Sequence, residues 1–177
     1  MSNTAGGAYA LTTFARILPG KADELEAYLA ALPRGARSPF ARLGGLHIAR
    51  VQIFRQLVHQ GPQQKHADVL RHAHLVFTST FDGELDPYLD ALAADVPEAD
   101  EWWGRCAGYP GRADRAAFRA YVRSRQVDTG LFQSAIPHAT LGDVREALAL
   151  RERVIDFAVA AQGLDATTLR ERFRSAF

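Results

Sequence analysis

Two hydrophobic periodicities alternate along this chain, and their order leaves few folds open. Alternation with period two, or a run of β-branched residues, indicates a strand, whereas apolar residues at steps of three and four indicate a helix. Strands are predicted at residues 9–17, 46–58, 72–81 and 131–136. Helices are predicted at residues 21–32, from 85 on, at 115–125, 140–161 and 167–173. The order is therefore strand, helix, two strands, two helices, strand and helices.

Polar residues and a glycine predict where two of the helices begin and end. Asp82 is suited to cap the helix that begins near Leu85, because a short acidic side chain accepts a bond from a free amide. Thr140 and Asp143 form a capping-box-like pattern at the start of the long helix, and Gly163 is suited to end it.

This order contains a βαββαβ unit, the split βαβ or ferredoxin-like arrangement. It predicts an α+β fold with an antiparallel sheet and helices on one face. Residues 1–7 are predicted to be a flexible N-terminus. Residues 8–177 are predicted to form a single ferredoxin-like domain, with an extra helix before the fourth strand and helices at the C-terminus.

The second predicted strand is apolar on both of its faces. Leu46, Ile48 and Phe54 share one face, and Ala49 and Val51 lie on the other. A strand has this composition when both of its faces are covered, but helices cover only one face of the predicted sheet. We therefore expect a homodimer in which two sheets face each other.

The charge balance and the cysteine content bound the partners and the compartment. The 177 residues include 21 basic and 20 acidic ones, a net charge of +1, so no overall field draws the chain to nucleic acid or to an anionic membrane. Cys106 is the one cysteine, which excludes an intrachain disulfide and favours a reducing compartment. We find neither a signal-peptide pattern nor an apolar run long enough to span a bilayer, and we expect a cytoplasmic protein.

The element order across about residues 8–160, together with the two-sided apolar strands, resembles the dimeric α+β barrel superfamily. This superfamily includes antibiotic-biosynthesis monooxygenases, EthD-like proteins, and heme-using dye-decolourising peroxidases and chlorite dismutases. The segments LHIAR (46–50), LVFTSTFDGELDPYL (75–89) and CAGYPG (106–111) also resemble an uncharacterised bacterial family associated with peroxidases. The resemblance implies a ligand, substrate or heme site in a cavity between the sheet and the helices, and it implies no catalytic residue.

Three histidines are weighed between a functional and a structural role. His47, near the start of the second strand, is a candidate heme ligand or general base, or else a half-buried histidine satisfied by the backbone. His72 and His74 form an H-x-H pattern whose side chains share one strand face. That pattern suits a transition metal, but no acidic third ligand stands at a helpful spacing. We favour a polar pair at a strand edge and predict no metal site.

Arg50 and Gln52 are polar residues in an otherwise apolar strand. If their face coincides with the face of His74 and Thr78 on the third strand, these residues and Gln133 line one cavity. A buried arginine needs a partner, because an unpaired buried charge is costly. That partner is either an acidic residue of the fold or an anionic group of a ligand.

Trp103 and Tyr109 belong to a cluster of aromatic residues and glycines around Pro110. Packing at the mouth of the barrel or at the dimer seam is the favoured role of this cluster, and stacking on a ligand is the second. Cys106 lacks a neighbouring base and a CxxC partner, which argues against a catalytic thiolate.

Two functions follow from these patterns. The first is an oxidative, monooxygenase- or peroxidase-like enzyme that binds a small, mainly apolar molecule or heme. The residues that serve it are, for catalysis or heme binding, His47, Arg50 and His74, and, for the substrate, Gln52, Thr78, Gln133, Trp103 and Tyr109. The second function is a non-catalytic dimer that carries a ligand or docks on a partner enzyme. The chain lacks the phosphate-binding, dinucleotide-binding, zinc-protease and serine-hydrolase motifs.

Overall fold

The computed structural model describes residues 3–59, 61–66 and 68–177, which fall into two compact units. The first unit extends to His138, and the second spans Ala139–Phe177. The single domain expected over residues 8–177 stays a prediction.

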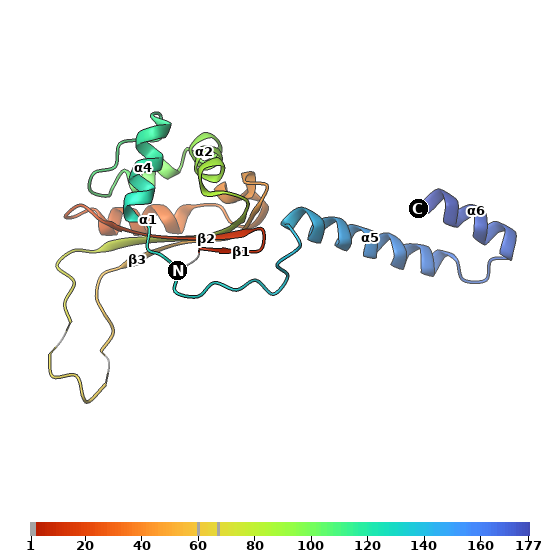
Figure 1. Ribbon diagram of the computed structural model, residues 1–177, viewed down its shortest axis with the longest axis horizontal. Helices are drawn as coiled ribbons and strands as arrows, with labels where there is room; N and C mark the ends of the chain where they lie inside the picture. The colour runs from red at the N-terminus through yellow and green to blue at the C-terminus, as the bar shows by residue number, and fades with distance from the viewer. Residues whose placement is uncertain (1–2, 60, 67) are drawn as a thin grey trace. The chain divides into compact units, whose positions relative to one another are not determined.

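The first unit is built on an antiparallel sheet with the strand order β1-β2-β4-β3 (Figure 1). The strands are β1 (Thr4–Ala5), β2 (Ala8–Arg16), β3 (Leu46–Phe54) and β4 (His74–Asp82). The predicted alternation in β2 is confirmed, because Leu11, Thr13 and Ala15 are buried on one side of the sheet. The predicted second strand ends earlier than expected, at Phe54, and the third begins later, at His74, which leaves His72 outside the sheet.

Helices cover one face of this sheet, as Figure 1 shows for α1, α2 and α4. The helices of the first unit are α1 (Ala22–Ala31), α2 (Leu85–Asp95), α3 (Ala99–Trp103) and α4 (Arg115–Arg125), with 3-10 turns η1 (Gly35–Arg37) and η2 (Pro39–Arg42). The predicted inner face of α2 is confirmed, since Leu85, Leu89, Leu92 and Ala93 are buried. An α+β fold with an antiparallel sheet and helices on one face is therefore confirmed. The ferredoxin-like topology and the dimeric barrel stay predictions.

Aromatic side chains fill the layer between the sheet and the helices. Trp103 contacts Phe77 of β4 at 5.2 Å and Phe118 of α4 at 5.5 Å between ring centroids. Trp102 contacts Phe40 of η2 at 5.4 Å. Burying each such ring contributes about 2–3 kcal/mol, and the edge-to-face pairs add to that. The short helix α3, which the sequence did not predict, therefore supplies the centre of the core.

The predicted fourth strand at residues 131–136 is wrong. The edge of β2 that this strand would need is already occupied, by β1 beside Tyr9 and by residues 126–127 beside Thr13. That edge of β2 is therefore closed to the segment beyond, and Leu131 is 87% exposed. Thr4–Ala5, which the sequence placed in a flexible start, pairs in the sheet instead.

The predicted cap of α2 is also wrong. The N-cap residue is Glu84, whose side chain makes no capping bond. Asp82 is the last residue of β4, and its side chain contacts His47 instead.

The second unit is a pair of helices, α5 (Leu141–Ala160) and α6 (Ala166–Ala176). The predicted start of α5 is confirmed, because Thr140 and Asp143 form a reciprocal capping box. No residue of α5 or α6 is buried, and both helices lie wholly within the described residues. Among the described residues, no helix is both long and apolar enough to cross a membrane.

Candidate functional site

The sheet face opposite the helices, called the open face below, carries the polar residues that the sequence singled out. Arg50 of β3, Thr78 of β4 and Thr12 of β2 are in register on three neighbouring strands. The expectation that the faces of Arg50 and Thr78 coincide is thus confirmed. The open face comprises Ala8, Ala10, Thr12, Phe14, Arg16, Ile48, Arg50, Gln52, Phe54, His74, Val76, Thr78, Thr80 and Asp82.

A hollow of about 530 Å³ lies on the open face. The strands supply most of its lining, and the segment that follows α4 supplies Thr129 and Phe132. Its side chains are both polar and apolar, and they are contributed by Ala10, Thr12, Ile48, Arg50, Thr78, Thr80, Thr129 and Phe132. The sequence placed a cavity between the sheet and the helices. Most of that space is instead the packed aromatic core, and Arg50 lines a hollow on the other side of the sheet. A smaller hollow of about 230 Å³ lies between α2 and the ends of β3 and β4, where Leu46, Asp82 and Tyr88 are among its lining residues.

Arg50 is exposed, which corrects the expectation that it is buried. Among the described residues it makes neither an ion pair nor a hydrogen bond. A guanidinium offers five donors in a planar fork that matches the geometry of a carboxylate or phosphate. The side chain is therefore available to bind an anionic group that enters the hollow.

The surroundings of Arg50 divide into hydroxyl groups and apolar groups. Thr12, Thr78 and Thr80 line the same hollow and offer hydroxyl groups that donate or accept hydrogen bonds. Ile48, which is 61% exposed, and Phe132 supply apolar surface. This arrangement suits a small molecule with one anionic group and an apolar body.

Three other predicted site residues lie outside the hollow. His74 is on the open face, opposite Phe54 and four residues along β4 from Thr78, about 13 Å away at ~3.3 Å per residue. Gln52 is in the next row of the open face after Arg50 and does not line the hollow. Gln133 is exposed, and its side-chain amide donates to the carbonyl of Ser134 at 3.3 Å.

His47 occupies an irregular position in β3. The pairing with β4 shifts between Leu46 and Ile48, which makes His47 the extra residue of a bulge. Its Nε2 atom lies 2.7 Å from Oδ1 of Asp82. The bulge thus turns His47 toward the end of β4, where the pair joins the two strands and lies away from the hollow.

Trp103 and Tyr109 have packing roles within the first unit, as the sequence favoured, whereas their place at a barrel mouth or a dimer seam stays a prediction. Trp103 is 1% exposed in the core, and Tyr109 packs against Phe118 of α4. The Tyr109 hydroxyl donates to Asp100 at 2.6 Å. Burial, and then this bond, raise the pKa of Tyr109. The cluster that the sequence singled out is therefore part of the folding core.

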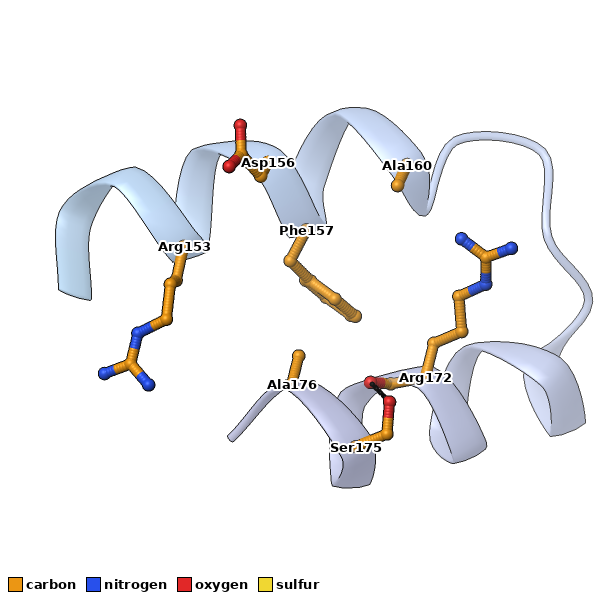
Figure 2. A pocket seen from close by; sticks show the side chains of 7 residues that line it. All are labelled: Arg153, Asp156, Phe157, Ala160, Arg172, Ser175 and Ala176. Atoms are coloured by element: carbon orange, nitrogen blue, oxygen red, sulfur yellow. Dashed lines mark hydrogen bonds between the residues drawn. The ribbon is translucent and has the colours of Figure 1, made fainter. Parts of the chain in front are cut away.

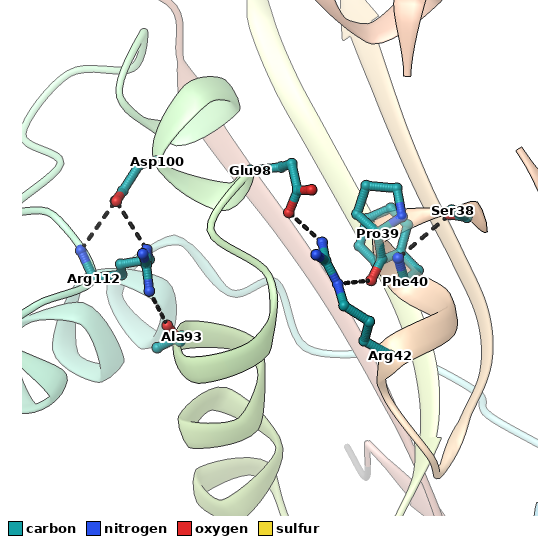
Figure 3. Close-up of polar contacts among 8 residues, drawn as sticks. All are labelled: Ser38, Pro39, Phe40, Arg42, Ala93, Glu98, Asp100 and Arg112. Carbon is teal, nitrogen blue, oxygen red and sulfur yellow. Dashed lines mark hydrogen bonds and ion pairs between the residues drawn. The ribbon is translucent and has the colours of Figure 1, made fainter. Parts of the chain in front are cut away.

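Two polar networks tie the helical layer together (Figure 3). In one, the Arg112 guanidinium and backbone amide donate to Asp100, and the guanidinium also donates to the carbonyl of Ala93 at 2.8 Å. In the other, Arg42 donates to Glu98 and to the carbonyl of Pro39. These contacts join α2, α3 and η2, and they stabilise the fold.

Cys106 is buried, and burial raises the pKa of its thiol to about 12. The thiolate, which is the nucleophilic form, is scarce at neutral pH. The expectation that Cys106 is not a catalytic nucleophile agrees with this environment.

A heme site needs a ligating side chain beside the macrocycle, and cationic groups suit its propionates. The hollow supplies Arg50, but its lining contains no histidine. The residues of the hollow therefore do not fit heme, and heme stays a prediction. Within the described residues, no three histidine, cysteine or acidic side chains gather where a metal ion would bind.

The sequence did not single out Thr12, Thr129 or Phe132. Thr12 shares its strand parity with Phe14, but only the pairing of β2 with β4 places it beside Thr78. Thr129 and Phe132 lie in the segment that follows α4 along the edge of β2. The path of this segment depends on which strands occupy that edge. Comparisons with family models, with curated proteins and with solved structures found no match to this chain.

Proposed function

We propose that this protein binds a small organic anion with an apolar body in the hollow on its open face. The observation that carries the proposal is an exposed arginine, unpaired among the described residues, in register with Thr12 and Thr78. Arg50 binds the anionic group, and the threonine hydroxyls accept or donate the remaining hydrogen bonds. Hydrogen bonds to a charged group contribute about 1.5–3 kcal/mol each, more than neutral ones.

The same face supports the homodimer as part of this proposal. Phe14 and Phe54 are 43% and 39% exposed, and their rings lie 6.4 Å apart above Val76. A second open face laid on this one would cover both rings and enclose the hollow. Enclosure excludes water, which strengthens the interaction of Arg50 with an anion.

Ligand binding without catalysis is the function that this geometry supports best. The side chains lining the hollow are arginine, threonine, alanine, isoleucine and phenylalanine, and His47 and His74 lie elsewhere. An oxidative reaction stays a prediction. An absorption spectrum recorded after adding hemin checks whether such a reaction could use heme. A Soret shift that His74→Ala abolishes would favour that form.

The proposal is tested with a fluorescent probe, 8-anilinonaphthalene-1-sulfonate, which has an anionic group and an apolar body. Arg50→Ala is expected to raise the Kd of the probe about 10- to 100-fold, because the charged contact is lost. Uncharged N-phenyl-1-naphthylamine is expected to bind the parent and the variant alike. The control is Arg37→Ala, which removes an exposed arginine of η1, outside the hollow.

Two results would overturn the proposal. One is an Arg50→Ala variant that binds the anionic probe as tightly as the parent. The other is an Arg37→Ala variant that loses as much affinity, which would show that the probe responds to overall charge.

A further inference from the structure

The long helix α5 has apolar residues on two opposite sides. On one side, Phe157 packs against Phe173 of α6 and Phe177 just after it, with 5.7 Å between ring centroids in each pair. On the other side lies a row that we call the outer stripe, which consists of Val144, Leu148, Ile155 and Val159 and is interrupted by Arg151 between Leu148 and Ile155. Its members recur at steps of four and seven residues, and Leu148 stands two and a half turns from Phe157.

The outer stripe is exposed along most of its length. Leu148 is 52%, Ile155 43% and Val159 67% exposed. A helix that is apolar on both sides is ordinarily packed between two layers. The structure shows one of these layers, which is α6.

The helical unit is too small to be stable as two helices alone. It spans Ala139–Phe177, and chains below about 40 residues usually need a disulfide, a metal or association with another chain. Cys106, the one cysteine, lies in the first unit. The described residues contain no three-ligand metal group. We therefore expect the helical unit to be stabilised by packing against another protein surface.

The inner side of the pair is itself incompletely closed. A hollow of about 460 Å³ lies between α5 and α6. Figure 2 shows Phe157 extending into it, between Arg153 of α5 and Arg172 of α6. Neither side of α5 is thus fully covered by α6.

Two charged residues beside the outer stripe indicate what kind of surface covers it. Arg145 and Glu152 lie on the same flank of the stripe, seven residues and about 10.5 Å apart along the axis. No basic residue stands three or four positions from Glu152, and no acidic one from Arg145. Among the described residues, neither side chain makes an ion pair.

We infer that α5 pairs with α5 of a second copy, antiparallel about a two-fold axis. In this arrangement Arg145 lies beside Glu152 of the second copy, and the symmetry repeats the contact. In a parallel pair, Arg145 and Glu152 would instead face the opposite flank of the second copy's helix. That flank carries Ala147, Val154 and Ala161, which are uncharged. The two helical units together then form a four-helix bundle, in which Val144, Leu148 and Ile155 of each copy face α5 of the other and Val159 lies beyond the first residue of that helix. This inference does not depend on the ligand proposed for the open face.

The first test is chemical cross-linking between single-cysteine substitutions in the full chain. Arg145→Cys and Glu152→Cys are purified separately and treated with a short bis-maleimide, alone and after mixing. The antiparallel pair predicts a covalent dimer in the mixture and little in either variant alone. The parent, whose Cys106 is buried, is expected to remain uncross-linked and serves as the control.

The second test reverses the charges and measures dimer dissociation by sedimentation at low salt. Arg145→Glu is expected to raise the dimer Kd about tenfold, because two ion pairs become two repulsions. The double variant R145E/E152R is expected to restore the parent Kd. A restored Kd would indicate a contact between the two copies, because positions 145 and 152 are too far apart to contact each other within one helix. Arg153→Glu, with the same charge change on the side of α6, is the matched control.

Three outcomes would overturn the inference. A parent chain that is monomeric would show that α5 does not pair with a second copy. Strong cross-linking of either variant alone would indicate a parallel pair. A double variant that dissociates as readily as Arg145→Glu would exclude the proposed contact.

Discussion

Single side chains of this protein are distinguished by what surrounds them more than by their chemical type. Arg50 is exposed and unpaired among the described residues, whereas Arg112 is held by Asp100 and a backbone carbonyl. His47 is bonded to Asp82, and Cys106 is enclosed by the core. Residue type alone would have ranked His47 and Cys106 with Arg50 as site candidates.

The surroundings of Cys106 predict how stability changes at alkaline pH. Burial raises the pKa of the thiol from 9.0 to about 12, so folding favours the protonated form. This contribution to stability is fully present below about pH 9 and is lost as the pH rises toward 12. We expect the free energy of unfolding of the parent to fall between pH 8.5 and 10, by at most about 1.4 kcal/mol per pH unit for this group.

Denaturant unfolding at several pH values checks this, with Cys106→Ala as the comparison. The variant is expected to be less stable at pH 7 but to lose less stability between pH 8.5 and 10. Buried Tyr121, whose pKa is raised to about 12 by burial and then by Cys106, adds a loss that begins nearer pH 10, so the two proteins are compared below that pH. Equal slopes for parent and variant below pH 10 would contradict the assignment to Cys106.

Among the elements, the short helix α3 contributes more to the fold than its length suggests. It supplies Trp102 and Trp103 to the core, and Asp100 to the network that reaches α2 through Arg112. Asp100 also accepts the Tyr109 hydroxyl, so one carboxylate joins α3 to the turn that follows it. The aromatic cluster between residues 102 and 109 is therefore held together by packing and by this one acid.

Replacing Asp100 is expected to weaken this part of the fold. Asp100→Ala leaves the Tyr109 hydroxyl and Nε of Arg112 without their acceptor, at a cost of about 1–3 kcal/mol. Urea denaturation measures the loss. Asp95→Ala, which removes an exposed acid at the end of α2, is the control and should change stability by less than about 0.5 kcal/mol. Equal stability of the two variants would contradict the role given to Asp100.

For the whole molecule, the proposed dimer has two separate contacts, one on the open face and one on α5. Phe54 lies on the open face outside the hollow. Phe54→Lys is expected to raise the dimer Kd by at least about tenfold, because a buried ring is replaced by a charge in both copies. Sedimentation over a range of concentrations measures this.

The control for the open-face contact is Val69→Lys, which makes the same charge change at a residue that is 78% exposed and outside the strands. An unchanged Kd for Phe54→Lys would remove the sheet contact from the proposal. Cross-linking between positions 145 and 152 tests the α5 contact alone. The two proposed contacts are therefore tested independently.

Local patterns were sufficient for the elements whose determinants lie within a few residues. The inner faces of α2 and α4 follow from apolar spacing, and the start of α5 follows from Thr140 and Asp143. The shared face of Arg50 and Thr78 follows from strand parity combined with antiparallel pairing. Each of these depends on periodicity or on a cap, which neighbouring residues specify.

Features that depend on competition between distant segments needed the tertiary structure. An apolar run at 131–136 indicates a strand, but β1 and residues 126–127 already occupy the edge it would pair with. Asp82 suits a helix cap, but the bulge at His47 brings a ring nitrogen to its carboxylate.

The sequence by itself determined the α+β class, most strand and helix positions and which residues share a strand face with Arg50, because periodicity encodes which residues share a face. The tertiary structure decided which face of the sheet is hollow and that Trp103 belongs to the core. The physical reason is that burial depends on which elements pack together, and packing partners are far apart in the chain.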